Sequence, residues 1–215
     1  MIFHDCIQGS DDWFSLRRGI PTASEFSRII TPAQGKTGGP GSKSYIAQLI
    51  GERLAIHLPV GAPSYTSRAM EHGREFEAEA RRLFAFETNL EIGNGGFCQT
   101  DDRRFGSSPD GLIGCSPTDE KEWTAQGALE LKCPQPETHA GYLLDGDILP
   151  TDYKYQVHGH LLVTGAPCCW FMSYCPGMRP LLLKIEPDDT TEKLRAALEE
   201  FHGRLIEALA KVRGS

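Results

Sequence analysis

The sequence has no run of about 18 consecutive apolar residues, the length that a membrane-spanning helix requires. Its beginning, MIFHDCIQGSDDWF, has neither the basic segment nor the apolar segment of a secretory signal. These absences argue against a membrane protein and against a secreted one. We therefore expect no membrane association and a location in the cytoplasm.

A CxxC pair is also absent, although the chain has 7 cysteines. Structural zinc ribbons, thioredoxin-type redox sites and most iron–sulfur sites use that spacing, so the sequence gives them no support. Most of the cysteines lie in apolar or strand-like surroundings. We expect buried free thiols in a reducing compartment, at Cys6, Cys98, Cys115, Cys133, Cys168, Cys169 and Cys175.

The chain also lacks an excess of positive charge. Its 215 residues include 22 Lys and Arg against 29 Asp and Glu, a formal net charge of −7. This balance excludes a protein coated in basic charge that binds any nucleic acid, but it leaves room for local contacts. A hydrophobic content of 40% indicates an ordered globular chain, and no repeat or long linker divides it. We expect one domain over residues 1–215.

Apolar spacing of three and four residues predicts helices in the first part of the chain and at its end. Ser10 has the position of a cap for a short helix that stops at Gly19, and Thr22 and Glu25 have capping-box spacing. A Gly- and Pro-rich loop is expected at 31–41. Further helices are predicted over about 43–57, 66–88, 152–164 and 188–212.

Short β-like runs replace the helical pattern after residue 90. They are punctuated by Gly- and Pro-containing turns, which separate successive strands. Their positions are 90–100, 104–113, 127–133, 168–174 and 181–185. The elements together predict a mixed α/β fold, in which a central mixed β-sheet is flanked by helices.

The sequence LELKCP contains the most informative pattern of the chain. Because side chains alternate across a strand, Leu129, Leu131 and Cys133 share one face. Glu130 and Lys132 share the other. The apolar face suits a core. The carboxylate and the amine on the opposite face are either a solvated pair or part of a site.

A Pro-Asp-Gly turn precedes this strand, with nineteen residues between Asp110 and Glu130. Turn chemistry alone accounts for such a turn. Taken together, however, the two segments place two carboxylates and a lysine on successive strands. Close carboxylates are compatible when a divalent cation lies between them, and Mg²⁺ prefers oxygen ligands. Lys132 beside a metal would orient the attacking water and neutralise phosphate charge.

Glu77 supplies a third carboxylate, on the long helix predicted before the first strand. Ala80 and Phe84 follow it at helical spacing, so Glu77 lies within or beside the apolar face of the helix. A buried acid is costly unless it is paired or binds a metal. The alternative is a Glu that reaches solvent or pairs with Arg81 at i+4.

The ordered set of motifs resembles the phage lambda exonuclease family of YqaJ-like recombinases, in the PD-(D/E)xK nuclease superfamily. The resemblance covers about residues 8–175. The PD…ExK pair alone is degenerate, whereas the complete ordered set is specific. That set comprises Gln8 and Trp13, LRRG at 16–19, TAS at 22–24, Gly73 with Glu77, SPDG at 108–111, LELKCP at 129–134, and Tyr153 with Gln156.

The resemblance implies a restriction-endonuclease-like core and a Mg²⁺-dependent 5′→3′ exonuclease. Such an enzyme degrades the 5′-ended strand of linear double-stranded DNA and leaves a 3′ single-stranded tail for recombination by strand annealing. The matching residues imply metal ligation, with two Mg²⁺ ions or Mn²⁺ as a substitute, by Asp110, Glu130, Glu77 and the Leu131 carbonyl. Lys132 matches the catalytic lysine.

Four further residues match positions around the site of that family. Gln156 matches a polar helix residue beside the metals, and Arg17, Ser24 and Ser108 match the residues that hold the terminal 5′-phosphate. Their chemistry suits the role, because a guanidinium group binds phosphate through two hydrogen bonds and hydroxyls donate to its oxygens. Without the resemblance, Arg17 would be interpreted as a surface arginine and Ser24 as a helix-start residue.

The family also implies a ring-shaped homotrimer, a phage or prophage origin in a bacterial host, and a single-strand annealing protein as partner. One alternative is a structure- or site-specific endonuclease of the same superfamily, which would cut covalently closed circles. Another is a DNA-end-binding module without catalysis. The intact Asp110, Glu130 and Lys132 argue against the latter.

Two histidines, His158 and His160, follow Gln156 on the same predicted helix. A carboxylate site for Mg²⁺ has little need of imidazole, so we expect core packing or polar contacts for both. Lys36 and Lys43, within and just after the 31–41 loop, are candidates for DNA contacts.

Overall fold

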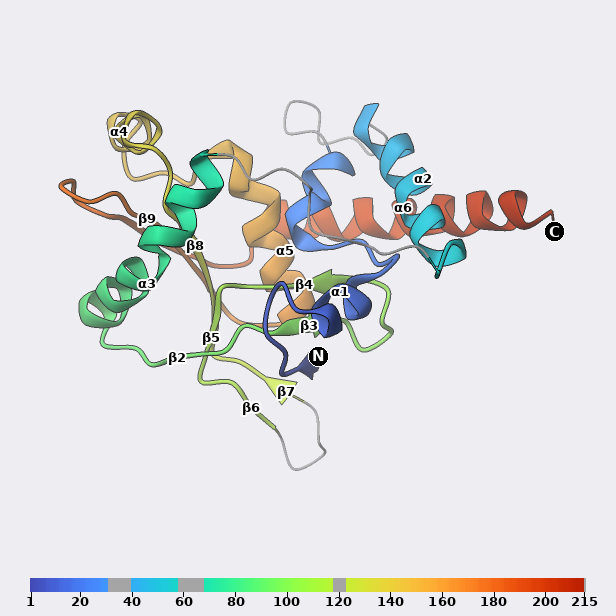
Figure 1. Cartoon of the computed structure of the whole chain (residues 1–215), viewed down its shortest axis with the longest axis horizontal. Helices are drawn as coiled ribbons and strands as arrows, with labels where there is room; N and C mark the ends of the chain where they lie inside the picture. Colours follow the sequence, from blue (N-terminus) through green and yellow to red (C-terminus); the bar gives the residue numbers. More distant parts are fainter. Residues whose placement is uncertain (31–39, 58–67, 118–122, 215) are drawn as a thin grey trace.

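A five-stranded mixed sheet, with strand order β10-β9-β8-β5-β2, lies between helices (Figure 1). The computed structural model describes residues 1–30, 40–57, 68–117 and 123–214. β8 and β9 run parallel, and the other neighbours run antiparallel, which confirms the predicted mixed sheet. The strands are β2 (Ile92–Gly93), β5 (Gly111–Ile113), β8 (Gly127–Lys132), β9 (Cys169–Ser173) and β10 (Leu181–Ile185).

The helices agree with the predicted ones, apart from small shifts at their ends and one additional helix, α4. Pro136 begins α4, a position where proline is tolerated because the first turn needs no N–H donor. The described helices are α1 (Asp11–Arg17), the 3₁₀ helix η1 (Ala23–Arg28), α2 (Pro40–Leu54), α3 (Arg68–Thr88), α4 (Pro136–Leu144), the 3₁₀ helix η2 (Thr151–Tyr153), α5 (Lys154–Thr164) and α6 (Asp189–Arg213).

Alternating side chains of the sheet enter two apolar clusters, one on each face. Leu129 and Leu131 of β8 pack with Ala80 and Phe84 of α3. Ala128 belongs to the other cluster, which α5 and α6 help to form. Both faces of β8 are therefore covered by helices, α3 on one side and α5 on the other (Figure 1).

Two segments predicted as single strands are each divided between two sheets, which corrects that prediction. The chain leaves one sheet and enters the other around 94–96 and again around 108–110. The two crossings touch, because a Cβ on Gly95 would lie 1.8 Å from the Pro109 carbonyl oxygen. The second sheet has the order β1-β3-β4 and consists of β1 (Ile2–His4), β3 (Phe97–Gln99) and β4 (Gly106–Ser107). A separate hairpin is formed by β6 (Ser116–Pro117) and β7 (Trp123–Thr124).

The segment after α1 forms a 3₁₀ helix, η1, without the predicted capping box. Ser10 does cap α1, accepting a hydrogen bond from the Trp13 N–H at 3.3 Å. The side chain of Thr22, in contrast, makes no cap hydrogen bond. Its hydroxyl accepts instead from Nη2 of Arg17 at 3.2 Å. The contact with Arg17 thus replaces the expected cap.

The 7 cysteines are all free, as expected. Cys6 and Cys115 are only half-buried, and the remaining five are buried. Burial raises the pKa of Cys98 to about 12, which keeps this thiol protonated at neutral pH. Within the described ranges, no helix is long and apolar enough to cross a membrane.

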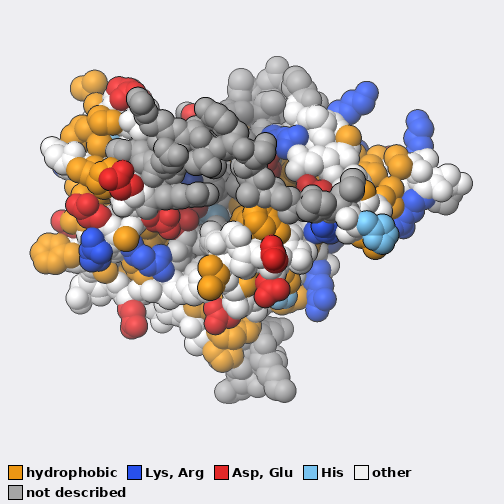
Figure 2. Space-filling view, in the orientation of Figure 1, with side chains coloured by type: hydrophobic (Ala, Val, Ile, Leu, Met, Phe, Trp, Pro, Cys, Tyr) orange, Lys and Arg blue, Asp and Glu red, His pale blue; other side chains and the backbone are white. Residues whose placement is uncertain are grey.

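Charges of both signs are interspersed on the surface, in agreement with the composition. Figure 2 shows acidic and basic side chains beside one another over α3, and Lys and Arg side chains around the end of α6. Arg104 forms ion pairs with both Asp102 and Glu199. Over the described part of this face, no continuous basic coat is present.

Gly159 lets α5 lie directly against η1. A Cβ at this position would lie 2.7 Å from Cδ2 of Phe26 and 2.9 Å from Cβ of Ala23. Both distances are shorter than ordinary van der Waals contact. The helix that carries Gln156 is therefore held close to the segment that carries Ser24.

Gly159→Ala should lower the free energy of unfolding by about 1–3 kcal/mol, because the added methyl group overpacks this contact. Gly203→Ala, in the interior of α6, is the matched control, since a Cβ there meets nothing within 4 Å. It should raise the free energy of unfolding by up to about 1 kcal/mol, through helix propensity. Urea denaturation measures both. Equal stability of the two variants would contradict the close packing of α5 on η1.

Candidate active site

The ends of β5 and β8 bring Asp110, Glu130 and Lys132 together. Gly111, the first residue of β5, pairs with Leu129 of β8. Asp110 immediately precedes Gly111, and Glu130 immediately follows Leu129, so the two carboxylates come from neighbouring positions on the two strands. Oδ2 of Asp110 accepts a hydrogen bond from the Leu131 N–H at 2.6 Å. Nζ of Lys132 forms a salt bridge with Oε1 of Glu130. The three groups predicted from the sequence thus form one cluster.

The Glu130 carboxylate is buried, with 1% of the side chain exposed. Nε2 of Gln156 donates to its Oε1 at 2.6 Å, and Nε2 of His160 lies 2.7 Å from its Oε2. Gln156 and His160 are four residues apart on α5, so they project from the same face of that helix. The interpretation of Glu130 and Lys132 as a solvated pair, one of the two considered from the sequence, is therefore wrong.

Burial and the charges of neighbouring groups shift the pKa values of Asp110, Glu130 and Lys132, and the shifts differ in direction. Desolvation, followed by the charge of Glu130, raises the pKa of Asp110 well above its ordinary value. Desolvation also disfavours the ionised form of Glu130. Lys132 and His160 favour that form, and they hold the pKa of Glu130 below its ordinary value. For Lys132 the charges of the two carboxylates outweigh desolvation and raise its pKa. Lys132 therefore stays cationic at neutral and moderately alkaline pH.

Glu77 is exposed on α3 and borders the cluster from outside. A hollow of about 730 Å³ is lined by Glu77, Asp110 and Lys132 among others. A second hollow of about 550 Å³ shares Glu77 and Asp110 and extends toward Gln8 and Arg81. The two carboxylates thus stand between two open spaces.

Arg81, the alternative partner considered for Glu77, binds backbone groups instead. Its guanidinium donates to the carbonyl oxygens of Asp110 at 2.6 Å and Gly93 at 2.9 Å. These bonds tie α3 to the turn that carries Asp110. Arg81 thereby helps to hold this turn in place.

The residues expected to hold a 5′-phosphate also lie together. Nη2 of Arg17 is 3.5 Å from the Ser24 hydroxyl, and its guanidinium stacks 4.0 Å from the Trp13 ring centroid. Nε1 of Trp13 donates to the Ser108 hydroxyl at 2.9 Å. Trp13 therefore connects Arg17 with Ser108, a role that the sequence interpretation did not assign to it.

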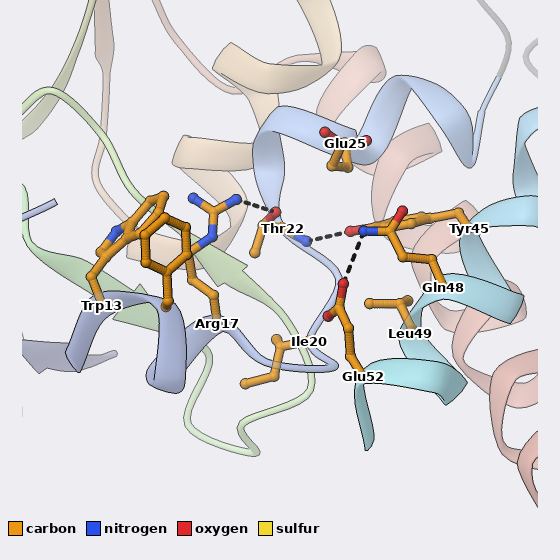
Figure 3. A pocket seen from close by; sticks show the side chains of 10 residues that line it. Trp13, Arg17, Ile20, Thr22, Glu25, Tyr45, Gln48, Leu49 and Glu52 are labelled. Atoms are coloured by element: carbon orange, nitrogen blue, oxygen red, sulfur yellow. Dashed lines mark hydrogen bonds between the residues drawn. The ribbon is translucent and has the colours of Figure 1, made fainter. Parts of the chain in front are cut away.

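A pocket of about 280 Å³ opens beside Arg17. Figure 3 shows Trp13 and Arg17 on one side of it, and Tyr45, Gln48 and Glu52 on the other. Burial lowers the pKa of the Arg17 guanidinium, although the group stays charged at any physiological pH. Arg17 supplies positive charge to this pocket, which the carboxylates of Glu25 and Glu52 also line.

The segment 107–110 joins the region of Arg17 to the carboxylate cluster. The Ser107 hydroxyl lies 2.6 Å from Nδ1 of His160, the ring that also contacts Glu130. Ser108 accepts from Trp13, which stacks on Arg17, and the Pro109 carbonyl accepts from Gln8 at 2.8 Å. Four consecutive residues therefore fix the position of the two regions relative to one another.

The donor set suits a hard divalent cation. Asp110, Glu130 and the Leu131 carbonyl would offer oxygen ligands, which Mg²⁺ prefers, and Mg²⁺ keeps several waters. Burial, and after it the charge of Glu130, raises the pKa of Asp110, and a bound cation would oppose both effects. Among the described residues, no three His, Cys, Asp or Glu side chains converge as a metal-binding group.

The two histidines of α5 both make polar contacts, as expected. Nδ1 of His158 lies 2.8 Å from the Thr191 hydroxyl, away from the cluster. His160 contacts Glu130 directly, which the sequence interpretation missed. Its spacing of four residues from Gln156 was the available signal. Lys43 is exposed on α2, and Lys36 lies outside the described residues.

Residues 12–167 match the family model of the YqaJ-like viral recombinase domain. The chain belongs to this family. The uncharacterized protein R354 of Acanthamoeba polyphaga mimivirus is 32% identical over 117 residues, which are 52% of this chain and 21% of that protein. This chain thus spans only about a fifth of the length of that viral relative.

Solved structures match over more than nine-tenths of the chain. The alkaline exonuclease of Laribacter hongkongensis superposes with a TM-score of 0.76 at 26% identity, covering 95% of this chain and 96% of that one. Its complex with dAMP gives a TM-score of 0.77. A phage-related exonuclease of Haemophilus somnus, 12% identical with a TM-score of 0.57 and covering 91% and 99% of the two chains, shows the shared fold alone. Family and fold together support a nuclease role.

Acidification should destabilise the protein through His158. Burial lowers the pKa of this ring below its unfolded value of about 6.5, so the unfolded chain binds more protons as the pH falls through that value. The free energy of unfolding should therefore decrease from pH 7 to pH 5. His158→Asn should reduce that slope by up to about 1.4 kcal/mol per pH unit. Urea titrations at pH 5, 6 and 7 measure it, and an unchanged slope in the variant would contradict the prediction.

Proposed function

We propose that the protein is a Mg²⁺-dependent 5′→3′ exonuclease acting on linear double-stranded DNA. It would degrade the 5′-ended strand and leave a 3′ single-stranded tail. The observation that supports this best is the 107–110 segment, which contacts Trp13 beside Arg17 at Ser108 and contributes Asp110 to the cluster with Glu130 and Lys132. A strand held by its terminal phosphate would present a phosphodiester to the cluster.

Each residue of the cluster has a distinct proposed task. Asp110, Glu130 and the Leu131 carbonyl would hold the divalent cation, with Glu77 contributing from the rim of the hollow. A bound cation would supply Lewis-acid activation of the phosphodiester and a lower pKa for the attacking water. Lys132, a cation held by two carboxylates, would orient that water and donate to the phosphate oxygens as charge develops.

The phosphate pocket would select the end of the duplex. Arg17 can form paired charge-assisted hydrogen bonds to a terminal phosphate, and the hydroxyls of Ser24 and Ser108 can donate to its remaining oxygens. The Trp13 ring keeps the guanidinium in place. A terminal monoester carries more negative charge than an internal phosphodiester, so this pocket would favour 5′-phosphorylated ends.

Assembly and partners are proposed from the family resemblance. We propose a ring-shaped homotrimer that holds the product single strand, and a single-strand annealing protein that receives it in recombination of phage type. Two bound ions and activity with Mn²⁺ belong to the same proposal. Light scattering of the full chain measures the mass of the assembly.

Linear and covalently closed circular duplexes distinguish the proposed exonuclease from an endonuclease. With Mg²⁺ present, the protein should release nucleotides from the linear duplex and leave the circle intact. EDTA should stop the release, and addition of Mg²⁺ should restore it. Cutting of the circle would favour the endonuclease, and no release under any condition would favour an end-binding module.

Lys132→Ala should lower the cleavage rate by at least about 10²-fold, because it removes a charge that stabilises the transition state. Binding to a 5′-phosphorylated duplex end should remain, since Arg17 is unaffected. Lys184→Ala is the matched control, as this lysine lies exposed on β10 and pairs with Glu186. Single-turnover digestion and end binding by fluorescence anisotropy measure the two effects. A normal cleavage rate in Lys132→Ala would refute the assignment.

Arg17→Ala should selectively weaken digestion of 5′-phosphorylated ends, by about 10-fold or more relative to 5′-hydroxyl ends. Arg18→Ala serves as control, because this neighbouring guanidinium donates to the Glu52 and Ala55 carbonyls. Competition between the two kinds of end gives the preference directly. Equal losses on both ends in Arg17→Ala would contradict the anchoring role.

A further inference from the structure

We propose that His160 is a positioning residue, which orients the Glu130 carboxylate for the divalent cation. The inference deepens the proposed function and rests on it. It concerns a buried imidazole that the family resemblance left without a role.

His160 is 1% exposed and lies between two polar partners. Its Nε2 is 2.7 Å from Oε2 of Glu130, and its Nδ1 is 2.6 Å from the hydroxyl of Ser107. Ser107 is fully buried, at the end of β4. The ring therefore connects α5 to a strand of each sheet, β8 and β4.

The chemistry of the Glu130 carboxylate determines the direction of its hydrogen bond with His160. An ionised carboxylate only accepts, so Nε2 of His160 carries the proton that Glu130 receives. In the neutral ring Nδ1 is then an acceptor, and Ser107 donates its hydroxyl proton to it. Every polar atom of the ring is satisfied in this arrangement. A rotated or flipped ring would lose at least one of these bonds.

The contact leaves the Glu130 carboxylate little freedom to turn. Gln156 holds its Oε1 and His160 holds its Oε2, and both side chains come from the same face of one helix. Partners that fix the direction of a metal-binding side chain typically contribute 10- to 100-fold, as an order of magnitude, to metal affinity. We expect His160 to act in this way on a cation bound by Asp110 and Glu130.

His158 provides an internal control on the same helix. It is also buried, and its Nδ1 contacts Thr191 on α6 instead of Glu130. Replacing either histidine removes a buried imidazole from α5. Only the replacement of His160 removes a donor to Glu130.

Substitutions at His160 separate the donor from the bulk of the ring. Gln places an amide nitrogen near the position of Nε2 and can still donate to Glu130. Asn places its amide nitrogen near the position of Nδ1 and cannot reach Glu130. Calorimetric titration of the full chain with Mg²⁺ should show affinity about 10- to 100-fold weaker in His160→Asn. His160→Gln and His158→Asn should stay within about threefold of wild type, on the same principle that the donor decides the affinity.

A second measurement requires no metal. Long-range ¹H–¹⁵N NMR spectra of the metal-free protein should show a proton on Nε2 of His160. The opposite tautomer would overturn the proposal, as would wild-type Mg²⁺ affinity in His160→Asn or equal losses in His160→Asn and His160→Gln. Thermal unfolding of His160→Asn and His158→Asn checks that both variants are folded. If the wild-type protein bound no Mg²⁺, the proposed function itself would fail.

Discussion

The arrangement of the site depends on the burial of one carboxylate, that of Glu130. A charge in the interior of a protein is costly unless hydrogen bonds and an opposite charge compensate it. Lys132 provides the charge from the same strand, and α5 provides donors to both carboxylate oxygens. To supply these donors, α5 must lie over the face of the sheet from which the Glu130 side chain projects, with Gln156 and His160 beside that carboxylate. Removing a single partner would leave the charge partly unsatisfied, so the group acts as a unit.

The same constraint extends to the pocket beside Arg17. His160 links the buried carboxylate to Ser107, and the residues that follow lead directly to Trp13 and to Asp110. Gly159 allows η1, with Ser24, to pack against α5 on the other side. The pocket and the cluster are therefore built on shared elements and not on independent loops. An enzyme that digests from an end needs this fixed separation, because the anchored terminus decides which phosphodiester reaches the reactive groups.

Much of this arrangement could be predicted from the sequence, and the limits have physical reasons. Alternation along β8 correctly assigned Leu129 and Leu131 to the core and Glu130 to the other face, because strand geometry is local. Family resemblance brought Arg17 together with Ser24 and Ser108, which local spacing could not have done. The change of sheet at 94–96 and 108–110 was missed, since strand propensity carries no information about which sheet a residue joins. The contact of His160 with Glu130 spans 30 positions and depends on how α5 packs. Tertiary contacts also overrode the capping box at Thr22, whose hydroxyl binds Arg17.

In the proposed exonuclease, an anchored 5′ end determines which strand is cut. Linear duplexes labelled separately at the 5′ end and at the 3′ end of one strand test this in the presence of Mg²⁺. The 5′ label should appear at once in mononucleotides, while the 3′ label should stay in long strands until digestion is almost complete. Immediate release of the 3′ label, with the 5′ label retained in long strands, would contradict it.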